Sequence, residues 1–175
     1  IYEYTLDKSF LENTAFPIMK KAAEFYLDIL TEDEKGNLII CPGTSPENNF
    51  IMGFGSSATS KSTAIMNSIV LDLFMGCKKS CEVLSIKDDF YTKICDSIEK
   101  IKPLCIGKKG ELLEWNEQLP EREVHHRHVS HLYALHPASL ITYEKAKDLF
   151  DACRKTLEIR GDDGTGWSLA WKINF

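Results

Sequence analysis

Residues 60–77 read SKSTAIMNSIVLDLFMGC and carry the clearest helical pattern in the chain. Apolar side chains recur there at steps of three and four, at Ile65, Met66, Ile69, Val70, Leu73 and Phe74. This spacing matches the 3.6-residue period of an α-helix, and the apolar stripe is wide. The stretch therefore predicts a long helix with one face in a hydrophobic core.

The same periodicity covers three other segments and begins a last one, at residues 7–30, 88–102, 142–159 and 165–175. Pro17 predicts either a kink in the first of these helices or a break followed by a new helix with Pro17 in its first turn. Thr142 is a candidate N-cap. Residues 38–41 form a short strand-like run, but no alternating pattern of useful length is present. The sequence thus predicts an all-α fold, as a toroid or solenoid rather than a compact bundle.

The bulk composition is that of an ordinary soluble domain, with 43% hydrophobic and 27% charged residues among 175. A net charge of -5 leaves no basic surplus for nucleic acid, and no apolar run is long enough for a membrane helix. No signal peptide is visible, so the compartment stays unknown. Because the chain starts at Ile1 and ends within an apolar helical pattern, we expect residues 1–175 to be a single domain truncated at both ends.

A first acidic motif, residues 41–48, reads CPGTSPEN. Pro46 precedes Glu47, and no helical period surrounds the pair, so a loop should present this carboxylate. Glu47 could act as a general acid that protonates a leaving glycosidic oxygen. The alternative is a turn glutamate bonded to nearby backbone amides.

A second acidic motif, residues 160–168, reads RGDDGTGWS. Asp162 or Asp163 could act as a general base that activates water on the far face of a sugar. Either could instead be the N-cap of the last helix. Trp167 and Trp171 lie four residues apart, so they could pave a sugar subsite or fill a core, and core is the default for Trp171.

A histidine block, HHRHVSH at residues 125–131, lies between the two acidic motifs. Zinc is an alternative there, but Arg127 would bring positive charge close and no CxxC is present, so we expect no metal and no cofactor. Imidazoles suit hydrogen bonds to sugar hydroxyls, and Arg127 and Arg160 suit clamping of carboxylates. Glu114 beside Trp115 is a weak carbohydrate-site signal, and Glu121 has the pattern of a surface charge.

Together these motifs resemble the glycoside hydrolase family 95 α-L-fucosidases. Four stretches carry the resemblance in the same order, at residues 41–48, 112–115, 126–133 and 160–174. The resemblance implies part of an (α/α)6 barrel and an inverting hydrolase that removes terminal α-1,2-linked L-fucose from oligosaccharides, with some members acting on L-galactosides. It also implies roles by position: Glu47 as general acid, Asp162 in the base system, and Glu114, His126, His128 and Trp167 at the sugar.

The asparagine pair that positions water in this family is absent from residues 1–175, and Asn48–Asn49 does not fit it. A carbohydrate-binding or scaffold piece without catalysis therefore stays open, as does another toroidal hydrolase or lyase. If the family roles hold, Glu47 and Asp162 should face each other across ~6.5 to 9.5 Å, the separation in inverting enzymes. We also expect the isolated chain to self-associate through apolar helix faces or to be marginally stable.

Overall fold

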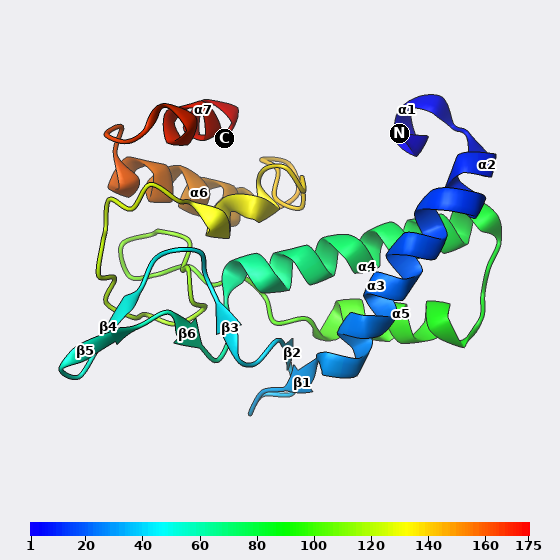
Figure 1. The fold of residues 1–175 in the computed structure, drawn as a ribbon, viewed down its shortest axis with the longest axis horizontal. Coiled ribbons are helices and arrows are strands. Elements are labelled where there is room, and N and C mark those ends of the chain that lie inside the picture. Colours follow the sequence, from blue (N-terminus) through cyan, green and yellow to red (C-terminus); the bar gives the residue numbers. More distant parts are fainter. The chain divides into compact units, whose positions relative to one another are not determined.

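The computed structural model describes residues 1–175, which form two compact units. Unit 1 comprises residues 1–39 and 70–102, and unit 2 comprises residues 40–69 and 103–175. The helix predicted at 60–77 is confirmed as α4 (Ala64–Leu84), which begins in unit 2 and continues into unit 1 (Figure 1). The single-domain prediction stays a prediction.

Unit 1 opens with a helical run that passes through Pro17. Its elements are α1 (Tyr2–Thr5), α2 (Lys8–Phe10), the π-helical η1 (Leu11–Ala15) and α3 (Phe16–Ile29). Pro17 lies in the first turn of α3 and lacks an N–H, and its ring would crowd the carbonyl four residues back in a regular helix. The wider π turn just before it accommodates the ring, so the backbone stays helical without a break. The placement of Pro17 in the first turn of a helix is confirmed.

A second helix of unit 1, α5 (Asp89–Lys100), is confirmed where the sequence placed it. The Asp88 carboxylate accepts a hydrogen bond from the Tyr91 N–H (3.0 Å) and caps the helix. Phe90 packs edge-on against Phe16 of α3, with ring centroids 6.2 Å apart. Strands β1 (Thr31–Glu32) and β2 (Leu38–Ile39) pair antiparallel, which confirms the strand-like run at its first two residues.

Unit 2 carries two small antiparallel ladders ahead of α4. Strand β3 (Gly43–Thr44) pairs with β6 (Thr59–Ser60), and β4 (Phe50–Met52) pairs with β5 (Gly55–Ser57) as a hairpin (Figure 1). The helical prediction holds for the main elements, but these strands were not predicted. Strands of two or three residues are too short to show a period-two pattern.

The rest of unit 2 consists of the 3₁₀-helix η2 (Ser130–Ala134), α6 (Lys147–Arg160) and α7 (Gly166–Asn174). The Thr142 N-cap prediction is wrong. Thr142 Oγ1 accepts from the Lys145 N–H (3.3 Å) in a separate turn, and α6 begins only after Ala146. The backbone of Ala146 (φ −151°, ψ 65°) leaves the helical region and separates the turn from the helix.

The core of unit 2 lies between η2, α6 and the loop before them. Its buried members are Leu112, Val129, Leu132, Ala134, Ile141, Ala152 and Cys153. On α7, by contrast, Ile173 is 85% exposed and Trp171 is 43% exposed. The predicted self-association stays a prediction. No helix in residues 1–175 combines the length and apolarity that a bilayer span requires.

Candidate active site

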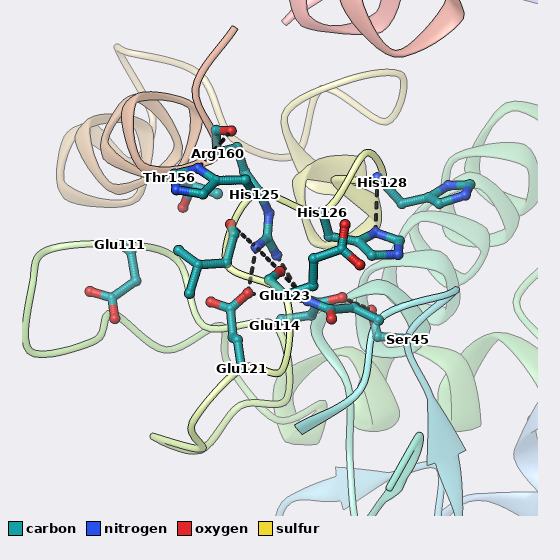
Figure 2. Close-up of polar contacts among 12 residues, drawn as sticks. Ser45, Glu111, Glu114, Glu121, Glu123, His125, His126, His128, Thr156 and Arg160 are labelled. Carbon is teal, nitrogen blue, oxygen red and sulfur yellow. Dashed lines mark hydrogen bonds and ion pairs between the residues drawn. The ribbon is translucent and has the colours of Figure 1, made fainter. Parts of the chain in front are cut away.

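One hydrogen-bond network in unit 2 joins all four stretches that carry the resemblance, and Figure 2 shows its members Ser45, Glu114 and Arg160. Ser45 Oγ donates to Glu114 Oε1 (2.7 Å) and lies 2.8 Å from Ser130 Oγ. Arg160 Nη2 donates to Glu114 Oε2 (2.7 Å). Because these residues are distant in sequence and adjacent in space, the motifs form one structure rather than separate sites.

Arg160 is the centre of this network and is only 2% exposed. It is the last residue of α6, and its guanidinium pairs with the carboxylates of Glu114 and Glu121. Nη1 also donates to the Val124 carbonyl (2.6 Å). A planar guanidinium can engage two carboxylates at once, and the predicted clamp role is confirmed. The surface-charge interpretation of Glu121 is wrong, because its carboxylate is held by this buried guanidinium.

Glu114 is 4% exposed, so its carboxylate lies inside the protein. Burial raises the pKa of Glu114, while the Arg160 charge and the Ser45 hydroxyl oppose that rise. Asn48 Nδ2 donates to both Glu114 Oε2 (3.3 Å) and Glu121 Oε2 (3.2 Å). The Glu114 carboxylate thus accepts from Ser45, Asn48 and Arg160, and the sugar-contact role predicted for it stays a prediction.

Glu47 lies between two anchored neighbours but is itself 60% exposed at its side chain. Arg127 Nη2 donates to Glu47 Oε2 (2.6 Å), so Arg127 pairs with a carboxylate as predicted, through one nitrogen and one oxygen. His128 Nε2 lies 3.4 Å from the same oxygen. The structure therefore brings the candidate acid together with the arginine and one histidine of the histidine block.

The two other predicted sugar ligands, His126 and Trp167, lie against His128. The His128 and Trp167 ring centroids are 4.9 Å apart, and the His126 and His128 rings stack at 5.3 Å. His126 is buried, and its Nδ1 accepts from the His128 N–H (3.0 Å), so the ring proton of its neutral form lies on Nε2. Burial lowers the pKa of His126, which favours that neutral form.

A cavity of about 290 Å³ opens beside these rings. Its wall includes Arg127, His128, Tyr133, His136, Trp167 and Trp171. Trp171 is 43% exposed and lies 5.8 Å from the His136 ring, so the default placement in a core is wrong. A cavity walled by indole and imidazole rings suits the apolar face and the hydroxyls of a sugar.

Asp162 and Asp163 lie exposed in the loop between α6 and α7. The residue before α7 is Thr165, so the N-cap alternative for either aspartate is wrong. Ser168 Oγ donates to the Arg127 carbonyl (2.6 Å) and ties the start of α7 to the histidine block. The general-base role of Asp162 and its separation from Glu47 stay predictions.

Comparison with known proteins decides the family. The model of the glycosyl hydrolase family 95 catalytic domain matches residues 1–175. The chain belongs to glycosyl hydrolase family 95. Alpha-L-fucosidase 2 of Arabidopsis thaliana is 38% identical over 173 residues, which cover 98% of this chain and 20% of that protein. Probable alpha-fucosidase A of Aspergillus niger is 28% identical over 184 residues, with 98% and 22% covered.

The family 95 chain spans about a fifth of the length of these curated relatives. The resemblance seen in the four motifs is thereby confirmed as family membership. Within residues 1–175, no three histidine, cysteine or acidic side chains gather as metal ligands.

The fully buried His131 gives the family 95 chain a pH-dependent stability. It is 1% exposed, its Nδ1 has no hydrogen-bond partner, and burial holds its pKa well below the usual 6.5. Below about pH 6.5 the unfolded chain binds a proton that the folded chain excludes, so stability falls with acidification by up to about 1.4 kcal/mol per pH unit. His131→Asn should reduce the difference in melting temperature between pH 7 and pH 5. If the difference in melting temperature between pH 7 and pH 5 is unchanged in this variant, His131 is not the source of the pH dependence.

Proposed function

We propose that this family 95 chain supplies part of the catalytic site of an α-L-fucosidase that removes terminal α-linked L-fucose, α-1,2-linked, with inversion. The observation that carries the proposal is the position of Glu47. Its exposed carboxylate contacts Arg127 and His128, and those two residues also line the cavity walled by Trp167. Both relatives bear fucosidase names, which supports L-fucose as the sugar.

In the proposed reaction Glu47 gives its proton to the glycosidic oxygen as the bond from that oxygen to the anomeric carbon breaks. A water attacks the same carbon from the opposite face, and its proton passes to the base system that contains Asp162. Glu47 must carry a proton before this step, and the protonated carboxyl no longer has the negative charge with which Arg127 pairs. Another group must then offset the positive charge of the Arg127 guanidinium until the proton has left Glu47. His128 and Trp167 hold the sugar through a hydrogen bond and ring contact.

The helices of this chain are proposed to belong to an (α/α)6 barrel. Support comes from family membership and from the long helices α3, α4 and α6, which are joined by loops that carry the motifs. The asparagine pair that the family uses to position water is not among residues 1–175, so the complete site requires the full-length protein.

The test is proton NMR of 2′-fucosyllactose hydrolysis by the full-length protein. We expect β-L-fucose to appear before mutarotation, because water attacks the face opposite to the leaving group. First appearance of α-L-fucose would show retention and overturn the roles given to Glu47 and Asp162. If no sugar is released, α-L-galactosides are the next substrates to test, and binding without release from either would favour the non-catalytic alternative.

A further inference from the structure

We propose that Arg160 and Glu114 form a buried positioning pair that holds the Glu47 loop and the Asp162 loop in one geometry. The proposal rests on the proposed function, because it concerns how that reaction's acid and base are aligned. Both side chains are 2% exposed, so they are assigned a positioning role and not direct contact with the sugar. They would act through the loops that they hold.

The Glu47 loop is anchored on both sides of the candidate acid. Ser45 and Asn48 are 1% and 2% exposed, and both donate to the Glu114 carboxylate, at 2.7 and 3.3 Å. Glu47 itself projects from between them into solvent. A loop whose two buried anchors bind one carboxylate moves when that carboxylate moves, and Glu47 moves with it.

The Asp162 loop is anchored through the backbone of Arg160. Asp162 follows two residues later, after Gly161, whose φ of +69° suits glycine and ends α6. The Arg160 carbonyl accepts a hydrogen bond from His125 Nδ1 (3.3 Å), so its backbone is held as well as its side chain. The buried guanidinium therefore determines where the Asp162 loop leaves the helix.

A third contact extends the pair to the histidine block. Ser45 Oγ lies 2.8 Å from Ser130 Oγ, and Ser130 begins η2 just after His128. Figure 2 shows Ser45, Glu114 and Arg160 in one chain of contacts, with His126 and His128 beside it. A single ion pair thus connects the candidate acid, the aspartate loop and the candidate sugar ligands.

The positioning role predicts which substrates are hydrolysed more slowly when one anchor of the Glu47 loop is removed. Ser45→Ala removes one anchor of the Glu47 loop and the contact to Ser130, but it leaves Arg160 and the Asp162 loop in place. Hydrolysis that needs a proton on the leaving group should therefore slow, while hydrolysis that needs little acid assistance should persist. Fluoride leaves with little acid assistance, so α-L-fucosyl fluoride reports water attack without testing the acid fully. We expect Ser45→Ala in the full-length protein to lower kcat on 2′-fucosyllactose by about 10- to 100-fold, with KM changed by less than about 2-fold.

On α-L-fucosyl fluoride, kcat of the Ser45→Ala variant should stay within about 3-fold of the wild-type value. Arg160→Lys keeps the charge but loses the two-carboxylate fork, so it should lower kcat on both substrates, because it loosens both loops. Ile94→Val, a core change in unit 1, is the control for loss of stability alone and should lower neither.

The outcomes separate the two proposals. If the wild-type protein releases no fucose from either substrate, the proposed function fails. A second outcome is that the wild-type protein is active while Ser45→Ala lowers kcat equally on both substrates, or changes kcat on neither. In that case the positioning role fails and the proposed fucosidase activity stands. Should Arg160→Lys not fold, the comparison of the two substrates with Ser45→Ala decides alone.

Discussion

Glu47→Gln is expected to lower kcat of the full-length protein on 2′-fucosyllactose by about 10² to 10⁴-fold, the usual contribution of a general acid. Glutamine has nearly the same shape, and its amide oxygen can still accept from Arg127 Nη2, so the loop should keep its position. What the variant lacks is a carboxyl proton for the leaving oxygen. KM should change little, because the sugar contacts proposed for Trp167 and His128 do not depend on that proton.

The matched control is Glu117→Gln, which makes the same chemical change at an exposed residue outside the network. It should leave kcat within about 2-fold of wild type, as for most surface substitutions. α-L-Fucosyl fluoride adds a second comparison, since Glu47→Gln should spare much of its hydrolysis. A loss below about 10-fold on 2′-fucosyllactose would be too small for a general acid and would return Glu47 to the role of a turn residue.

The helices were predictable where the pattern is local. Apolar residues at steps of three and four located α4 and placed α5 within residues 88–102, because this periodicity operates within a few residues. The start of α6 was missed, since Thr142 has the chemistry of an N-cap but caps a separate turn. Local residue types do not say whether a turn joins the helix that follows.

The sequence indicated which residue types would form the candidate site, but it did not indicate which residues would pair with one another. Arg127 and Arg160 were expected to clamp carboxylates, but their partners are 80 and 46 positions away in sequence. Glu114, predicted to contact the sugar, also follows two leucines and precedes a tryptophan. A charged residue among apolar ones is rarely buried without a partner, and that signal could have suggested an internal ion pair.

Arg160→Met is expected to destabilise unit 2 by about 3–5 kcal/mol, the cost of leaving a buried charge without its partner. Methionine approximates the length of the stem, so packing changes less than the electrostatics. Glu114 is 2% exposed at its side chain and would lose its charged partner, whereas Glu121, at 24%, could regain water. The measurement is hydrogen exchange of the α6 amides in the full-length protein, which reports local opening without requiring global two-state unfolding.

The origin of that cost is separable with a double-mutant cycle. If the penalty comes from the unpaired Glu114 carboxylate, then Glu114→Gln should restore part of the protection in the Arg160→Met background, because the amide removes the buried charge. Alone, Glu114→Gln should be destabilising, since it leaves the guanidinium with one carboxylate in place of two. Coupling of at least about 1 kcal/mol between the two changes is expected. Additive losses would show that Arg160 stabilises unit 2 through its backbone-carbonyl contacts, and the ion pair would then lose its place as the link between the two loops.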